Sequence, residues 1–190
     1  MLTCAFPVFS SAADASQGGY IVLSDDADAR LVAAGDTLAK YMKQVTGKDF
    51  PVAADGEGLT FTLGYSADIP DNGYVIETKE NEVSILGSGT RGVIHGVYAF
   101  LEDSIGCRFY FPGVLGEVVP KQSRIELAEI DRRTAPDFSV REWYNGKRAF
   151  WFGKTANDAE GERMKNLDWL RLRMGTRKIP LCHGTRKFHY

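Results

Sequence analysis

The chain has 190 residues, of which 44% are hydrophobic and 25% charged, and its formal net charge at pH 7 is -2. This length and composition are typical of a globular protein with one domain and part of a second, and they exclude a collagen-like or largely disordered chain. Nucleic-acid-binding domains are usually strongly basic, whereas this chain is close to neutral, so no nucleic acid is expected as a partner.

Residues 1–17 resemble a signal peptide. An apolar stretch from Leu2 to Phe9 precedes small residues that include Ala13-Asp14-Ala15, an A-x-A pattern typical of cleavage sites, although a basic start is missing. We expect a secreted or periplasmic protein. The alternatives are that residues 1–17 are an untethered tail and that the protein is cytoplasmic. No other segment approaches the roughly 18 apolar residues of a membrane helix, so no membrane span is expected.

The folded part begins with a strand followed by an amphipathic helix. Residues 20–24 are rich in β-branched side chains, which favours a strand. In residues 25–47 apolar residues recur at helical spacing, and Gly47 supplies a C-terminal stop. The apolar positions of this predicted helix are Leu31, Ala34, Leu38, Tyr41, Met42 and Val45.

Short strands and a second helix follow. The strands are predicted over residues 50–54, 59–64, 73–78 and 82–87. Only Lys79-Glu80-Asn81 separates the last two, a length suited to an antiparallel hairpin. The second helix is predicted over residues 90–105, with Thr90 as its N-cap and Gly106 at its end.

The pattern becomes more polar after the second helix. Residues 107–111 and 117–120 are predicted as short strands, and residues 124–138 as a polar extended connection that carries Pro136. We place a domain boundary in this connection. A new strand is predicted over residues 139–144. The chain ends where a later strand and its loop are beginning, so we expect a fragment of a longer protein.

The segment ILGSGTRGVIHG raises the question of a dinucleotide site, because Gly87, Gly89 and Gly92 have G-x-G-x-x-G spacing between a strand and a helix. Such a site also needs an acidic residue about 20 positions on, which binds the ribose. No carboxylate stands there, and the strand belongs to a predicted hairpin. We therefore expect no cofactor. We interpret Gly87 and Gly89 as making the turn, and Gly92 and Gly96, four apart on one helical face, as letting the helix lie close to the sheet.

The three cysteines give no sign of a metal site or a disulfide framework. Cys4, Cys107 and Cys182 are far apart, form no CxxC pair and have no His at metal-ligand spacing. We interpret them as small buried hydrophobic residues. His95 lies between apolar positions of the second helix and is interpreted as a packed or junction histidine.

Several ordered blocks of the sequence resemble a known family. Gly73 to Ile76, Arg91 to Glu102 and Gly106 to Pro112, followed by EVVPK, are similar to the non-catalytic N-terminal domain of bacterial alpha-glucuronidases. A similar small domain precedes the barrel in beta-hexosaminidases. The resemblance covers residues 18 to 144.

The resemblance implies an α+β fold over residues 18–135, with a small mixed, largely antiparallel sheet and two helices packed on it, as in domain 2 of hexosaminidases. It implies that residues 136–190 are the truncated beginning of a (β/α)8 barrel. The catalytic carboxylates of these families lie deeper in the barrel, beyond Tyr190, so no catalytic residue is expected in this chain.

The implied function is that of a non-catalytic accessory domain of a glycoside hydrolase-like enzyme, which acts on uronic acid or hexosamine glycosides. Carbohydrate is then the partner, reached through the adjoining barrel, and the 190-residue fragment is expected to be inactive. A stand-alone carbohydrate-binding or protein-interaction module is the alternative. The sequence identifies neither the sugar and linkage nor the oligomeric state.

Four residues are candidate sugar contacts: Arg141, Glu142, Trp143 and His183. Arg141 and Glu142 stand at the C-terminal end of the expected first barrel strand, where barrel active sites are built, and His183 follows the expected second strand. In the hexosaminidases an Arg near the position of Arg141 hydrogen-bonds sugar hydroxyls. Two alternatives stay open: an ion pair at the domain junction for Arg141, and packing in an interface for Trp143.

Overall fold

The structure is a computed structural model of the chain, and it describes residues 18–110, 114–123, 125 and 127–138. The chain divides into two units, Met1–Pro136 and Asp137–Tyr190. The fold presented below is that of the first unit. The signal-peptide-like segment 1–17 and the predicted barrel strands after residue 138 lie outside the described residues, so both stay predictions.

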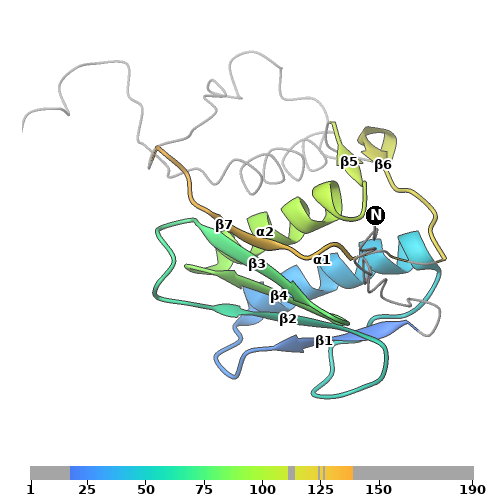
Figure 1. Cartoon of the computed structure of the whole chain (residues 1–190), viewed down its shortest axis with the longest axis horizontal. Helices are drawn as coiled ribbons and strands as arrows, with labels where there is room; N and C mark the ends of the chain where they lie inside the picture. Colours follow the sequence, from blue (N-terminus) through green and yellow to red (C-terminus); the bar gives the residue numbers. More distant parts are fainter. Residues whose placement is uncertain (1–17, 111–113, 124, 126, 139–190) are drawn as a thin grey trace, which may run out of the picture. The chain divides into compact units, whose positions relative to one another are not determined.

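The described elements alternate between strands and helices along the chain (Figure 1). In order they are β1 (Gly19–Leu23), α1 (Ala29–Thr46), β2 (Leu59–Tyr65), β3 (Tyr74–Lys79), β4 (Glu82–Gly87), α2 (Thr90–Asp103), β5 (Arg108–Phe109), the 3-10 helix η2 (Val114–Gly116), β6 (Glu117–Val118) and β7 (Asp131–Thr134).

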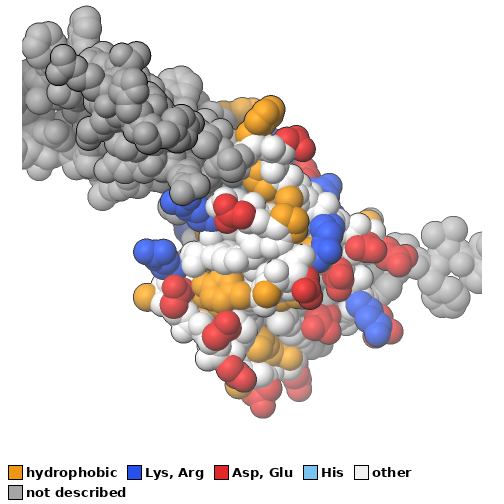
Figure 2. Space-filling view, turned by 90° about the vertical axis from the view of Figure 1, so that its left-hand side faces the viewer, with side chains coloured by type: hydrophobic (Ala, Val, Ile, Leu, Met, Phe, Trp, Pro, Cys, Tyr) orange, Lys and Arg blue, Asp and Glu red, His pale blue; other side chains and the backbone are white. Residues whose placement is uncertain are grey.

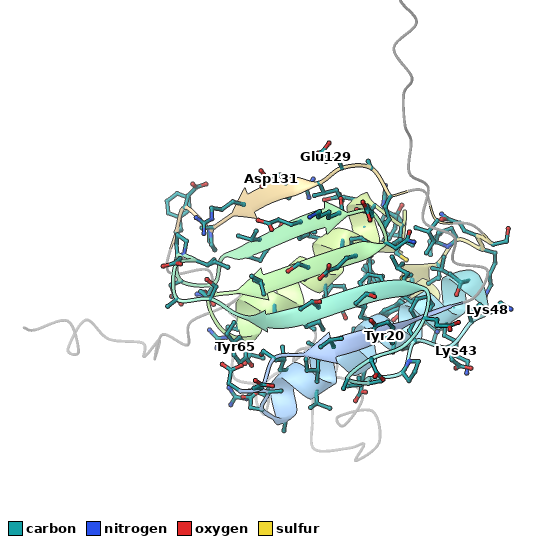
Figure 3. The ribbon with its side chains drawn as sticks, turned by 60° about the horizontal axis from the view of Figure 1, so that its bottom comes forward. Tyr20, Lys43, Lys48, Tyr65, Glu129 and Asp131 are labelled. Carbon is teal, nitrogen blue, oxygen red and sulfur yellow. The ribbon has the colours of Figure 1, made fainter. Side chains whose placement is uncertain are left out.

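Five of the strands form one mixed sheet in the order β1-β2-β4-β3-β7. The pairs β1/β2 and β2/β4 are parallel, whereas β3/β4 and β3/β7 are antiparallel. Both helices lie on one face of this sheet (Figures 1 and 3). The predicted α+β fold, a mixed sheet with two helices packed on it, is therefore confirmed. The sheet is not largely antiparallel as expected, since two of its pairings are parallel and two antiparallel. Because α1 carries the chain back, β2 runs parallel to β1.

The hydrophobic core lies between the sheet and the two helices. Alternate residues of the strands point to the helix side, so Ile21, Phe61 and Ile85 are fully buried. The rings of Phe61 and Phe100 meet edge to face, with centroids 5.4 Å apart, and this contact joins β2 to α2. All six apolar positions predicted for the first helix are buried.

The helix ends follow from local chemistry. Gly47 adopts a left-handed conformation (φ 74°) and its N–H donates to the Lys43 carbonyl, which confirms the predicted stop of α1. The prediction that Thr90 caps α2 is wrong by one residue. Gly89 is the N-cap and, having no side chain, makes no side-chain capping bond. The Thr90 hydroxyl instead lies next to the Tyr65 hydroxyl.

Two predicted segments at the sheet edges differ from the expectation. Residues 50–54 form no full strand: Val52 makes an isolated bridge to Ile21, since Pro51 carries no N–H to extend a ladder. The predicted polar connection contains β7, whose four residues are exposed and pair with β3. Charged side chains are typical of an edge strand, which explains why the sequence pattern missed it.

Candidate functional site

The predicted sugar contacts Arg141, Glu142, Trp143 and His183 lie outside the described residues, so the structure does not bring them together or separate them. Within the part of the chain that is described, no group of three or more His, Cys, Asp or Glu side chains is placed to hold a metal ion. Among the same residues, no helix is long and apolar enough to cross a membrane.

Three of the four glycines between residues 87 and 96 are explained by the close packing of α2 against its neighbours. A Cβ atom on Gly92 would stand 2.1 Å from the Gly73 carbonyl oxygen, and one on Gly96 would stand 2.6 Å from Cγ2 of Ile85. A Cβ atom on Gly87 would also collide with the helix backbone, whereas one on Gly89 would meet nothing within 4 Å. The predicted close approach of the helix to the sheet is therefore present. Three of these four glycines are required by space.

The carboxyl ends of β1, β2 and β4 lie on the same side of the molecule as the N-termini of both helices. Figure 2 views this side, where hydrophobic side chains stand among Asp and Glu side chains. In Figure 3 Tyr65 stands at this edge, away from Lys43 and Lys48 at the other end of the sheet. Ligands of open α/β sheets commonly bind at such an edge, so its polar groups are the first candidates for a site.

The polar side chains at this edge hydrogen-bond to one another. Asp28 Oδ1 accepts from the backbone N–H groups of Leu31 (2.9 Å) and Arg30 (3.1 Å) and from the Tyr65 hydroxyl (3.0 Å). The Tyr65 oxygen is also 3.0 Å from Thr90 Oγ1. Since a carboxylate only accepts, Tyr65 donates to Asp28 and Thr90 donates to Tyr65.

The electrostatics of this cluster agree with a structural role. The hydrogen bond from the Leu31 N–H is the main cause that lowers the pKa of Asp28, and burial is the main cause that raises the pKa of Tyr65. Asp28 is thereby held as a carboxylate and Tyr65 as a phenol. The cluster ties the N-termini of α1 and α2 to the end of β2. No sequence pattern indicates this cluster, because its three members are far apart along the chain.

A second cluster attaches β5 and β6 to the helices. The ring of Phe109 packs edge-on against Tyr41 and Tyr98, with centroid distances of 5.0 and 4.9 Å. Lys40 Nζ lies 4.5 Å from the centroid of the Tyr41 ring and 3.9 Å from Glu117 Oε2. Burial is the first cause that raises the pKa of Tyr41, followed by the neighbouring Tyr98.

Cys107 lies directly before β5, beside this cluster. It is a buried free thiol, as the sequence predicted for the cysteines, and burial raises its pKa to about 11. A thiol of this kind is protonated at neutral pH and therefore behaves as a packing group and not as a nucleophile.

The hairpin beyond this cluster carries exposed apolar side chains. Tyr110 is 71% exposed, Val114 86%, Leu115 92% and Val118 52%; we call these four residues the apolar tip. The strands predicted over residues 107–111 and 117–120 carried no expectation of this exposure. The signal was the uncharged run FYFPGVLG, whose glycines and proline do not suit a buried strand.

Comparison with known proteins gives the class of this fold. Residues 10–102 match the family model described as glycosyl hydrolase family 20, domain 2, a non-catalytic accessory domain of glycoside hydrolases. The match covers just under half of the chain. A search of the curated proteins returns no match.

Solved structures share the fold. The N-acetyl-beta-hexosaminidase of Streptomyces plicatus, in complex with Thio-NAglucal, is 24% identical, with a TM-score of 0.50 over 66% of this chain and 23% of that chain. The family GH20 beta-N-acetylhexosaminidase of Streptomyces coelicolor A3(2) is 22% identical, with a TM-score of 0.51 over 65% of this chain and 23% of that chain.

A third solved structure has a different activity. It is a family GH115 4-O-methyl-alpha-glucuronidase with specificity for decorated arabinogalactans, and it is 12% identical, with a TM-score of 0.50 over 85% of this chain and 24% of that chain. The chain thus spans about a quarter of the length of these structures. Together, the family model and these folds support an accessory domain of the glycoside hydrolases.

Proposed function

We propose that the chain is the non-catalytic accessory domain of a secreted or periplasmic carbohydrate-active enzyme that hydrolyses uronic acid or hexosamine glycosides. The match of residues 10–102 to domain 2 of glycosyl hydrolase family 20 carries this proposal. The hexosaminidase and glucuronidase activities named for the solved structures motivate the two substrate classes. On this proposal the 190 residues alone hydrolyse no glycoside, because the catalytic carboxylates stand in the barrel that follows.

The proposal divides the chain into an accessory domain over residues 18–135 and the start of a (β/α)8 barrel over residues 136–190. The substrate contacts are then Arg141, Glu142, Trp143 and His183, at the barrel end where active sites are built. In a strand, alternate side chains point to opposite sides, so Arg141 and Trp143 share one side and Glu142 takes the other.

Arg141 is the residue whose role is best tested. A guanidinium that faces the barrel interior donates paired hydrogen bonds to vicinal hydroxyls or to a uronate carboxylate, a geometry that Lys does not reproduce. In the full-length enzyme, Arg141→Lys should therefore lower kcat/KM by roughly tenfold or more, which corresponds to about 1.4 kcal/mol or more of transition-state binding. The melting temperature should scarcely move.

The test uses chromogenic uronides and N-acetylhexosaminides, with Arg133→Lys as a matched control on the described edge strand β7. Unchanged turnover together with a lower melting temperature for Arg141→Lys would assign Arg141 to an ion pair at the domain junction. A full-length protein that binds carbohydrate yet releases no sugar would instead support a stand-alone binding module.

A further inference from the structure

We propose that Asn72 is a deamidation site which the native fold holds almost unreactive, and that isoaspartate formed there after local opening breaks the start of β3. The chemistry needs only this chain and water, so the site is independent of the proposed function. It lies in the loop that joins β2 to β3, directly before Gly73 and Tyr74.

The sequence at this loop is the pair that loses ammonia most readily in proteins. Asparagine is among the chemically labile residues, and a following glycine has no side chain to hinder the approach of its main-chain nitrogen. The chain contains two such pairs, Asn72-Gly73 and Asn145-Gly146. Only the first lies within the described residues, so the structure tests the environment of Asn72.

The reaction at Asn72 has two steps. First, the Gly73 nitrogen forms a bond to Cγ of Asn72, the bond from Cγ to Nδ2 breaks, and ammonia leaves with the proton of the Gly73 N–H. Water then opens the resulting succinimide ring at one of its two carbonyl carbons, which gives aspartate or isoaspartate. In isoaspartate the main chain runs through Cβ and Cγ, so it is one carbon atom longer.

The native turn opposes the first of these steps. The Gly73 N–H donates to the Pro70 carbonyl oxygen at 2.7 Å, which closes a turn over residues 70–73. Asn72 holds the third position of this turn with φ 58°, a left-handed conformation that asparagine tolerates better than most residues. The Gly73 nitrogen is therefore committed to Pro70, and its attack on Asn72 requires that the turn opens.

Tight packing around Gly73 keeps the turn closed. The Gly73 carbonyl oxygen accepts from the Ser88 N–H at 3.2 Å, and a Cβ atom on Gly92 would stand 2.1 Å from the same oxygen. A Cβ atom on Gly73 itself would stand 2.9 Å from the Thr134 carbonyl oxygen. Backbone from three other segments thus surrounds Gly73, and its main chain has no room to move while the domain is folded.

The same packing makes isoaspartate damaging once it has formed. Tyr74 is the first residue of β3 and pairs with Gly87 of β4 and Thr134 of β7, so β3 lies between two strands at this point (Figure 1). One extra main-chain carbon at residue 72 displaces Gly73 where no space is free. The turn and the first pairs of β3 are then lost together.

The first experiment measures deamidation in the 190-residue chain at pH 8, with and without urea, by mass-spectrometric peptide mapping. In urea, Asn72 and Asn145 should react at similar rates, since both precede glycine. Without urea, Asn72 should react roughly tenfold or more slowly than in urea, because the reaction waits for local opening. Asn81 is the internal control: it is exposed but precedes Glu82, so it should react slowly under both conditions.

The second experiment tests the damage with two variants that both carry Asn145→Gln. One retains Asn72, and the other has Asn72→Gly, which suits the left-handed conformation and has no amide to lose. Both are aged in urea, refolded and melted. Only the chain with Asn72 should yield an isoaspartate fraction that melts lower or fails to refold.

Two results would overturn the proposal. One is deamidation of Asn72 that is as fast without urea as with it, since the fold would then give no protection. The other is aged protein with isoaspartate at residue 72 whose melting temperature equals that of the aged Asn72→Gly chain.

Discussion

Replacement of Gly92 by alanine tests the role of the glycines at the start of α2. Gly92 lies where α2 meets the end of the sheet, and an added Cβ atom would stand 2.1 Å from the Gly73 carbonyl oxygen and 3.1 Å from Cα of Gly87. Both obstacles are backbone atoms, so no side-chain rotation relieves the clash. The helix must move away from the sheet.

The magnitude follows from two opposing effects. Overpacking of a filled interior costs about 1–3 kcal/mol, and a collision with backbone belongs at or above the upper end of that range. Alanine in place of glycine within a helix returns about 1 kcal/mol of helix propensity. We therefore expect Gly92→Ala to lower the free energy of unfolding by roughly 2 kcal/mol or more, and the melting temperature by roughly 8 °C.

Gly35→Ala in α1 is the matched control. Its added Cβ atom would meet Cδ2 of Leu23 at 3.4 Å, near ordinary van der Waals contact, so the gain in helix propensity should remain and the variant should be stabilised by up to about 1 kcal/mol. Urea denaturation followed by circular dichroism measures both. If Gly92→Ala is as stable as wild type, the packing interpretation is wrong. Saturable binding of NAD or FAD in calorimetry would restore the nucleotide interpretation.

Three further predictions concern the same unit. Asp28→Ala should lower the melting temperature at pH 7, and Asp28→Asn should lower it less because Asn also caps helices, while exposed Asp36→Asn leaves it unchanged. Because the folded pKa of Asp28 is lowered from 3.8, its stabilisation is present above that pH and lost below it, so wild type and Asp28→Ala should converge in acid. Cys107, with a pKa raised to about 11, should resist iodoacetamide at pH 8 until urea unfolds the chain; peptide mass mapping that finds it labelled in native protein would contradict its burial. A polypeptide of residues 16–137 should melt cooperatively, and a broad calorimetric transition would show that the predicted boundary is misplaced.

Local sequence patterns predicted most of the fold. Helical spacing and Gly47 defined α1, and the three residues between β3 and β4 indicated their hairpin, because each signal depends on neighbours within a few positions. The prediction that Gly92 and Gly96 let α2 lie close to the sheet is also confirmed, since a Cβ atom on either would collide with a neighbouring residue. The candidate sugar contacts were predicted from a family resemblance and stay predictions, as they lie beyond the described residues.

The sequence by itself therefore determined the two helices, the central strands and the need for glycine where α2 meets the sheet. Only the tertiary structure decided that Asp131–Thr134 forms an edge strand on β3 and that Asp28, Tyr65 and Thr90 share one hydrogen-bonded cluster. It also decided that the apolar tip is exposed. The edge strand and the hydrogen-bonded cluster depend on contacts between residues far apart in the chain. The exposure of the apolar tip depends on the folded surface, because the apolar character of a residue alone does not tell whether it is buried.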